Sequence, residues 1–249
     1  MRVLDVEPSR VLAVYAHPDD AEVSCGGALG RWASAGAEVH VIVVARGEKG
    51  SRDPSVDPDE LASARTEETK AAGAVLGIAE HHWLGRADGE VVDDTSLRSD
   101  IVRIIRAVRP DVVVAPDPTA VFFGEHYVNH PDHRAVGWAA LAAVSHASGN
   151  PHYHPECGAA WTATTFLLSG TLQPDAWIDI TATLEKKVEA LACHRSQLGE
   201  AGEWLRNVVV QRTLEAGRAA GVTHAESFRQ LEVRCLTTSQ AVSPPQSVR

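Results

Sequence analysis

The chain has 249 residues, of which 44% are hydrophobic and 22% charged, and it carries a formal net charge of −10. A chain of this length and even composition can bury one large core, so we expect a single domain over residues 1–249, with its core at about 10–228 and a loose tail at 241–249. The Lys and Arg residues are scattered, which argues against a nucleic-acid partner because phosphate backbones are bound by clustered cations. A small-molecule partner is the better expectation.

The cysteines and the start of the chain indicate the compartment. Cys25, Cys157, Cys193 and Cys235 are far apart and form no Cys-x-x-Cys pair. Residues 1–10 lack the apolar core of a signal peptide, and no run approaches the ~20 apolar residues of a membrane span. We therefore expect a reduced, cytoplasmic protein.

Strand and helix patterns alternate along the chain. β-branched apolar runs predict strands, and apolar residues at helical spacing predict helices. In chain order the pattern predicts a strand at 10–16, a helix at 21–35, a strand at 37–45, a helix at 59–76, a strand at 80–84, a helix at 97–108, a strand at 111–116, a loop at 117–129, a helix at 131–145, a strand at 163–169, and helices at 181–197 and 203–219. This alternation predicts an α/β fold of Rossmann-like type, with a mostly parallel sheet and helices on both of its faces.

Two short motifs follow strands of the predicted sheet. The segment Ala16-His17-Pro18-Asp19-Asp20 ends the first strand, and His130-Pro131-Asp132-His133 opens the helix that comes after the fourth. In such sheets, ligands bind in the crevice beyond the carboxyl ends of the strands, so both motifs should face the same crevice. We expect them to be two halves of one site.

The residue types suggest a metal centre. Imidazoles from His17 and His133 with a carboxylate from Asp20 are suitable ligands for Zn²⁺ or Fe²⁺, which leaves Asp19 and His130 beside a bound water. The plainer alternative is that each motif is a turn in which an aspartate caps a helix and the histidines are solvated. The occurrence of both motifs at one sheet edge favours the metal centre.

Four segments resemble the PIG-L/LmbE family of metal-dependent N-deacetylases: Ala16–Gly27 (AHPDDAEVSCGG), Ala45–Ser51 (ARGEKGS), Ala64–Glu68 (ARTEE) and Asn129–Gly137 (NHPDHRAVG). The resemblance implies that His17, Asp20 and His133 are the metal ligands and that Asp19 is the general base. It also implies that His130 stabilises the transition state, protonated and supported by Asp132. By the same resemblance, the substrate-contacting residues are Glu48, Arg65 and Asp88.

The resemblance implies a hydrolase that removes an acetyl group from an N-acetylated small molecule, with one divalent ion as its cofactor. An amino sugar or conjugate of N-acetylglucosaminyl type is the expected substrate, and a non-sugar N-acyl amine is the alternative. Zn²⁺ is the expected ion, with Fe(II) as the other candidate. Two functions of other classes stay open, an Fe(II)-dependent oxygenase and a non-catalytic nucleotide-binding module. The alternating pattern opposes the first, and the carboxylates of the first turn oppose the second.

Several residues are left without a catalytic assignment. Some sugar deacetylases of the family have a tyrosine two positions before the first histidine of the second motif, where this chain has Val128, with Tyr127 and His126 before it. Cys25 is expected to pack in the core, and the apolar stretch 138–144 with Trp161 suits either the core or an oligomer interface. The segment 194–197 has no assigned role. Surface or hydrogen-bonding roles are expected for His81, His82, His152, His154, His194 and His224.

Overall fold

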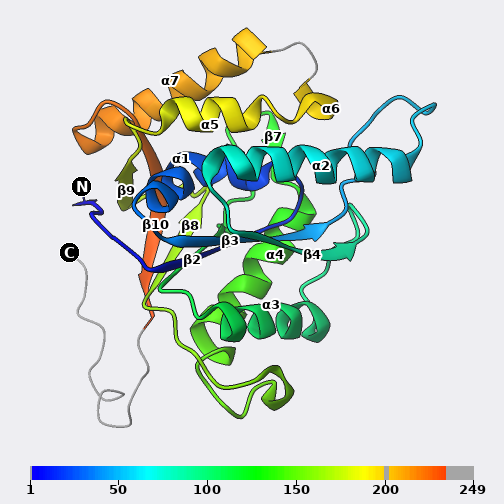
Figure 1. Ribbon diagram of the computed structural model, residues 1–249, viewed down its shortest axis with the longest axis vertical. Helices are drawn as coiled ribbons and strands as arrows, with labels where there is room; N and C mark the ends of the chain where they lie inside the picture. The colour runs from blue at the N-terminus through cyan, green and yellow to red at the C-terminus, as the bar shows by residue number, and fades with distance from the viewer. Residues whose placement is uncertain (1, 199–201, 234–249) are drawn as a thin grey trace.

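Eight strands form one mostly parallel sheet through the centre of the protein (Figure 1). The computed structural model describes residues 2–198 and 202–233. Within this part of the chain β10 is the strand that runs antiparallel to its neighbours in the sheet. The strands, in spatial order, are β1 (Arg2–Val3), β9 (Ala176–Asp179), β10 (Ala225–Glu232), β8 (Thr165–Ser169), β5 (Val112–Pro116), β2 (Arg10–Tyr15), β3 (Glu38–Ala45) and β4 (Glu80–Arg86).

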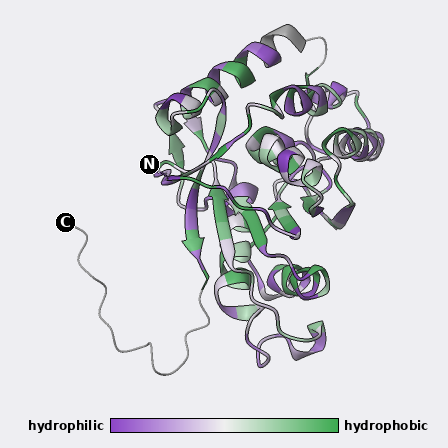
Figure 2. Cartoon of the chain, turned by 60° about the vertical axis from the view of Figure 1, so that its left-hand side comes forward, coloured by the Kyte–Doolittle hydropathy of each residue, from purple (hydrophilic) through white to green (hydrophobic). Residues whose placement is uncertain are grey.

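Helices cover both faces of the sheet (Figure 1). On one face lie α1 (Asp20–Ser34), α2 (Pro58–Leu76), α5 (Leu184–Leu191), α6 (Arg195–Leu198) and α7 (Gly202–Ala220), and on the other lie α3 (Thr95–Val108) and α4 (Pro131–Ala142). Alternate residues of each strand point to opposite faces, so Val11 and Ala13 join the core beneath α1 while Leu12 and Val14 join the core with α3 and α4. Colouring by hydropathy shows apolar strands between helices of mixed polarity (Figure 2).

The connections around β2 create the crevice that the site needs. The chain leaves β2 through α1 to reach β3 on one side, and it later reaches β5 on the other side of β2. The loops that follow β2 and β5 therefore diverge, which leaves a depression at the carboxyl ends of these two strands. The loop after β2 carries the first motif, and the loop after β5 leads to the second.

A buried ion pair holds α1 on the sheet. The helix is kinked at Cys25, and the backbone N–H groups of Gly27 and Ala28 donate to the carboxylate of Glu226 on β10 at 2.9 and 2.8 Å. The ammonium of Lys187 lies 2.5 Å from the same carboxylate, and both side chains are almost fully buried. A Cβ at position 27 would lie 2.7 Å from Ile180, so glycine is required where the kinked helix meets the residue that follows β9. These contacts fix the helix whose first residue is Asp20.

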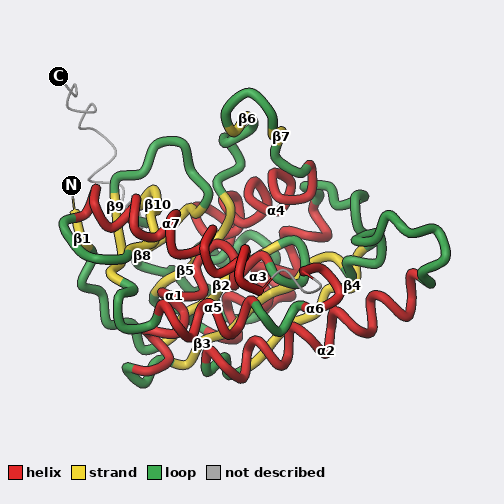
Figure 3. Tube along the Cα trace, turned by 90° about the horizontal axis from the view of Figure 1, so that it is seen from above, coloured by secondary structure: helices red, strands yellow, loops and turns green. Residues whose placement is uncertain are grey.

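The predicted elements up to residue 169 are confirmed, with end shifts of one or two residues for most of them. The predicted strands correspond to β2, β3, β4, β5 and β8, and Gly77 ends α2 in the left-handed conformation. The predicted helix at 131–145 is α4 followed by a π-helical turn at Ala143–Ala147. The predicted loop at 117–129 contains a two-stranded hairpin, β6 (Phe122–Phe123) and β7 (Tyr127–Val128), which projects beside α4 (Figure 3).

The C-terminal third differs more from the prediction. The helix expected at 181–197 is divided into α5 and α6, and the sequence did not predict β1, β9 or β10. The tail at 241–249 and Cys235 lie outside the described residues, while Cys25, Cys157 and Cys193 are free thiols. Within the stretch 138–144, Val144 is buried in the core and Trp138 is 45% exposed. Among the described helices, none is long and apolar enough to cross a membrane.

Candidate active site

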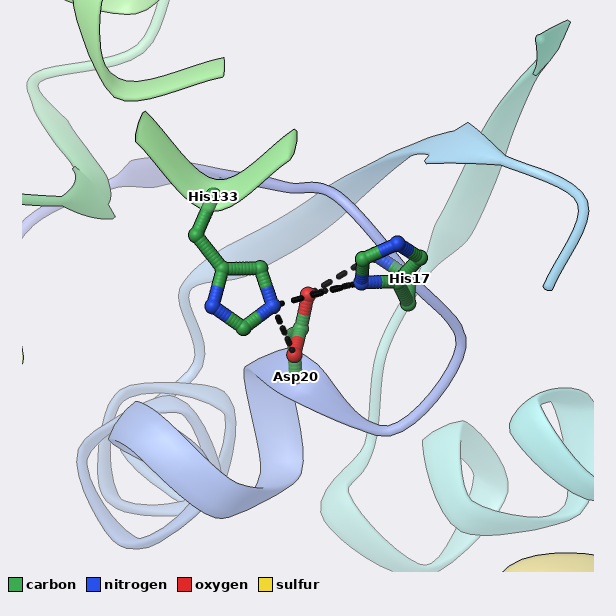
Figure 4. A group of neighbouring side chains, drawn as sticks. All are labelled: His17, Asp20 and His133. Carbon is green, nitrogen blue, oxygen red and sulfur yellow. Dashed lines mark hydrogen bonds and ion pairs between the residues drawn. The ribbon is translucent and has the colours of Figure 1, made fainter. Parts of the chain in front are cut away.

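Three side chains meet at the carboxyl ends of β2 and β5 (Figure 4). His17 Nδ1 is 3.2 Å from His133 Nε2 and 3.4 Å from Asp20 Oδ2, and Asp20 Oδ1 is 3.1 Å from His133 Nε2. Bonds of ~2.1 Å to a tetrahedral ion place its ligand atoms ~3.4 Å apart. The two predicted halves of the site are therefore adjacent, at separations that suit a single divalent ion.

The remaining nitrogen of each imidazole has an oxygen acceptor. His17 Nε2 lies 3.1 Å from Asp88 Oδ1 and 3.2 Å from Asp132 Oδ2, and His133 Nδ1 lies 3.0 Å from Asn129 Oδ1. Acceptors there hold the proton on the outer nitrogen, so the lone pair of the inner nitrogen points to the centre. The residues present thus fit a divalent cation. The sequence motif contained Asn129, but its role as the partner of His133 was missed.

The charges of this cluster also favour a bound cation. Burial lowers the pKa of His17, but its hydrogen bonds to Asp132, Asp20 and Asp88 outweigh that effect and raise it to about 12. Burial raises the pKa of Asp20, yet contact with His133 and His17 holds it below the ordinary value. Three carboxylates around one imidazole need compensating positive charge, which a divalent ion can supply.

Asp19 leaves the helical path at the turn before α1. Its φ is 96°, in the left-handed region that Asp and Asn tolerate better than most side chains. It occupies the N-cap position, but its carboxylate makes no capping hydrogen bond, so the capping alternative is wrong for this residue. Oδ2 instead accepts a hydrogen bond from Arg65 at 3.2 Å. Burial and the charge of Asp20 raise the pKa of Asp19 to about 7, against the opposing effect of Arg65.

Each of the residues predicted to contact substrate is bonded to protein groups. Arg65 and Asp88 line a cleft with His17, and Glu48 contacts the backbone of Asp88. The buried guanidinium of Arg65 donates to Pro18 O at 2.7 Å and to Gly47 O at 2.9 Å, in addition to Asp19. Glu48 Oε1 accepts from the backbone N–H of Asp88 at 3.0 Å, while its Oε2 is buried without a hydrogen-bond partner. Arg65 therefore orients the turn that carries Asp19. Substrate contact by these three residues stays a prediction.

The hydrogen bonds of Asp132 run to other groups than His130, and its expected pairing with a protonated His130 stays a prediction. The fully buried Asp132 carboxylate contacts His17 and accepts from the backbone N–H of Gly89 at 2.7 Å. Asp132 reaches His130 through its own backbone N–H, which donates to His130 Nδ1 at 3.3 Å and caps α4. Burial lowers the pKa of His130, and the charge of His17 lowers it further while Asp132 opposes. With Nδ1 accepting, the proton of a neutral ring is on Nε2.

Two clefts meet at the centre. The smaller cleft, of about 350 Å³, is lined by His17, Asp19, Asp88 and His130. The larger cleft, of about 710 Å³, is lined by Asn129, Phe123 and Arg212. Tyr127 and His133 line both clefts. Volumes in this range accommodate small-molecule ligands. Tyr127, whose role the sequence left open, lies on the exposed hairpin at the junction of the two clefts, with its ring 5.9 Å from that of Phe123.

Two imidazoles and a carboxylate within ligand distance of one another, with a further carboxylate and imidazole beside them, are the groups that a metal-dependent hydrolase uses. The family model described as "PIG-L: GlcNAc-PI de-N-acetylase" matches residues 12–144, which include both motifs. The chain belongs to the PIG-L family.

Relatives of the chain include two deacetylases. The chain is 32% identical over 226 residues to diacetylchitobiose deacetylase of Thermococcus kodakarensis, covering 88% of this chain and 82% of that protein. It is 31% identical over 246 residues to 1D-myo-inositol 2-acetamido-2-deoxy-alpha-D-glucopyranoside deacetylase of Rhodococcus jostii, with 76% and 82% covered. The structure of N,N'-diacetylchitobiose deacetylase from Pyrococcus horikoshii superposes with a TM-score of 0.82 at 29% identity, covering 91% of this chain and 85% of that one.

Proposed function

We propose that the protein removes the acetyl group from an N-acetylglucosaminyl-type amino sugar or conjugate, releasing acetate and the free amine. The observation that carries this proposal is the group formed by His17, Asp20 and His133 with Asp19 beside it, at the junction of two ligand-sized clefts. Membership of the PIG-L family supports the reaction, and the sugar substrates named for both relatives support the substrate class.

His17, Asp20 and His133 would hold the ion, and Zn²⁺ is the ion we propose because two imidazoles and one carboxylate are a common set of catalytic zinc ligands. When bound, such an ion polarises the acetamide carbonyl and lowers the pKa of a coordinated water toward ~7. The mostly parallel sheet is not the antiparallel framework expected of the alternative Fe(II) oxygenase. The turn after β2 presents carboxylates where a phosphate-binding loop needs glycines, which disfavours the nucleotide-binding alternative.

Two neighbouring side chains, Asp19 and His130, provide proton transfer and a hydrogen bond to the oxyanion. Asp19 lies at the cleft with His17 and His130, and in its ionised form it accepts a proton from the attacking water. The water oxygen adds to the carbonyl carbon, which gives a tetrahedral oxyanion. Neutral His130 donates its Nε2–H hydrogen bond to that oxygen, in the role of an oxyanion donor. Asp19 then returns its proton to the amine nitrogen as the C–N bond breaks.

The clefts suggest how the rest of the substrate is held. The smaller cleft, which contains the base, suits the acetamide and its sugar ring, and Asp88 with Lys49 at its rim offers hydrogen bonds to hydroxyl groups. The larger cleft begins at His133 and extends past the aromatic pair Phe123 and Tyr127 toward Arg212. Aromatic faces and a cation suit a second sugar or a polar aglycone.

The test is release of acetate from a panel of N-acetylated compounds. The panel contains N,N'-diacetylchitobiose, an N-acetylglucosaminyl-inositol conjugate, free N-acetylglucosamine and a non-sugar N-acetyl amine. We expect the two conjugates to have the highest kcat/KM, since they can occupy both clefts. A higher kcat/KM for the non-sugar amine would favour the alternative substrate class. No acetate from any compound, with an ion bound at the group of His17, Asp20 and His133, would contradict the proposed reaction.

A further inference from the structure

Two adjacent strands carry the same Glu-x-His pattern at their amino-terminal ends. The pattern is Glu38-Val39-His40 in β3 and Glu80-His81-His82 in β4. The register pairs His40 with Glu80. Because side chains two residues apart share a face of a sheet, the two histidines and both glutamates lie on the same face. The strand order therefore gathers two imidazoles and two carboxylates, away from the crevice at the carboxyl ends.

Three atoms of this cluster have the separations of metal ligands. His40 Nδ1 is 3.1 Å from His82 Nε2, and Glu80 Oε2 is 3.7 Å from the first nitrogen and 3.9 Å from the second. The point equidistant from the three atoms lies about 2.1 Å from each, which is the length of a Zn–N or Zn–O bond. The two imidazole nitrogens face each other in a hydrogen bond, so an ion would replace that bond with a small rotation of both rings.

Glu38 supports His40 from behind. Its Oε1 is 3.3 Å from His40 Nε2, the ring nitrogen that faces away from His82. A carboxylate there holds the proton on Nε2 and leaves the lone pair of Nδ1 for an ion, as a carboxylate does behind many metal-binding histidines. The side chain of His40 is only 7% exposed, so the strands hold it in place.

The other two groups provide a second imidazole and a route from solvent. The side chain of His82 is 19% exposed, and its ring stacks on that of His40. The side chain of Glu80 is 59% exposed, which allows an ion to reach the cluster. Two imidazoles and one carboxylate leave a fourth position for water on a tetrahedral ion.

We propose that β3 and β4 bind a second divalent transition-metal ion, with Zn²⁺ as the best match, through His40, His82 and Glu80. The site lies roughly 17 Å along β3 from the end of the strand, at ~3.3 Å per residue. β4 is the edge strand, and the chain that follows it supplies Asp88, which contacts His17. The second ion therefore fastens the edge strand that leads into the active site. The role proposed for this ion is structural, because it joins β3 to the edge strand β4.

The number of bound ions tests this proposal. Full-length protein freed of metal by chelation is equilibrated with excess Zn²⁺, separated from free ion by gel filtration, and assayed for zinc. We expect two ions per chain for the wild type and one for His82→Ala. His82→Ala should keep its kcat/KM for acetate release within about twofold, because one ion still occupies the first site. A matched control, His81→Ala, removes the neighbouring histidine on the opposite face and should keep two ions.

A Co²⁺ titration gives an independent measurement. In a His17→Ala, His133→Ala double variant, shown to be folded by circular dichroism, one equivalent of Co²⁺ should still give the visible absorption of a low-coordinate site. Adding His82→Ala to that variant should abolish the absorption. One zinc per wild-type chain, two in His82→Ala, or no cobalt absorption from the folded double variant would each overturn the second site. The zinc count and the cobalt absorption need no substrate, so they separate this proposal from the proposed reaction.

Discussion

Two clusters of histidine and carboxylate lie on one sheet, and they are built in different ways. At the carboxyl ends of β2 and β5, the turn after β2 and the first turns of α1 and α4 supply the ligands, and Asp19 takes a left-handed conformation beside them. At the start of β3 and β4, regular strand register alone assembles the side chains. Loops can present a base and a donor from other directions, whereas a strand face presents only its own alternate residues. Similar sets of histidines and carboxylates can thus support a catalytic site, as proposed for the first cluster, or a structural metal site, as proposed for the second.

The clusters also differ in their charge and exposure. The first contains Asp88 and Asp132 as well as its ligand Asp20, and Asp132 is fully buried. The second has Glu38 and Glu80, both more than half exposed at their side chains. Water screens exposed carboxylates, so the second cluster has less need of a cation than the first. We therefore expect the first site to bind its ion more tightly.

Removing a ligand of the first site should have the largest effect. His133→Ala leaves two ligands, and we expect at least ~10³-fold loss of kcat/KM together with loss of one bound ion, because several kcal/mol of transition-state stabilisation go with the ion. Chelation of the wild type should abolish acetate release, and Zn²⁺ or Co²⁺ should restore it. Full activity in fully metal-free protein would contradict a catalytic role for the ion of the first site.

Asp19→Asn should separate proton transfer from ion binding. Asparagine tolerates the left-handed φ of 96°, so the turn is preserved while the base is lost. We expect kcat to fall by ~10²–10⁴-fold with the zinc content unchanged. Asp19→Ala is the less informative variant, because alanine is strained at this φ. Near-normal turnover in Asp19→Asn would show that another group accepts the proton.

His130→Asn tests the donor in the same way. The Asn oxygen can take the place of Nδ1 as the acceptor for the Asp132 N–H, which keeps the cap of α4, but no N–H remains at the position of Nε2. We expect kcat to fall by about 10²-fold with little change in zinc content. If the variant lost the ion as well, His130 would belong with the ligands.

Asp132→Asn should weaken ion binding at the first site. An amide cannot balance the charge of His17 as the carboxylate does, and loss of such a partner typically lowers metal affinity by ~10–100-fold. Competition with a chromophoric chelator measures the change. An unchanged zinc affinity with an altered kcat would instead support the pairing of Asp132 with His130 that the sequence suggested.

Glu38→Gln is the matched change at the second site and should have the smallest effect. Glu38 stands behind His40 as Asp132 stands behind His17, but its side chain is 58% exposed. We expect the affinity for the second Zn²⁺ to fall by up to about tenfold, below the loss at Asp132. The same chelator competition, carried out on protein with one ion already bound, reports it. An effect larger than that of Asp132→Asn would reverse the expected order of the two sites.

Much of this molecule could be predicted from local patterns. The β-branched runs of β2, β3 and β5 are buried on both faces, so they give a strong strand signal, and the order of the motifs placed His17, Asp20 and His133 together. The polar strand β10 (AESFRQLE) has no such signal, because its strand pairing is decided by the neighbouring β8 and β9. His194, at the division of the helix predicted over 181–197, is fully buried near Glu22, a tertiary contact that no local pattern reveals.

In the site, too, individual contacts could not be predicted from local sequence patterns. Residue type and position identified His130 and Asp132, but the partner of each carboxylate depends on distances between loops. The backbone N–H groups of Gly89 and Val91 hold Asp132 toward His17, and these groups are invisible in a motif. The Glu-x-His pattern of β3 and β4 is present in the sequence, but only the strand register shows that the two copies lie side by side on one face of the sheet.

The left-handed turn at Asp19 also bears on how this protein can change over evolutionary time. Its φ of 96° penalises most side chains, and the replacements that it accepts most readily are asparagine and glycine. Neither can take a proton from water, and both leave Arg65 its contacts with Pro18 O and Gly47 O. The substitutions that the backbone tolerates best at position 19 are therefore those that remove the proposed general base. A single substitution at Asp19 would thus keep the turn while removing the proposed base.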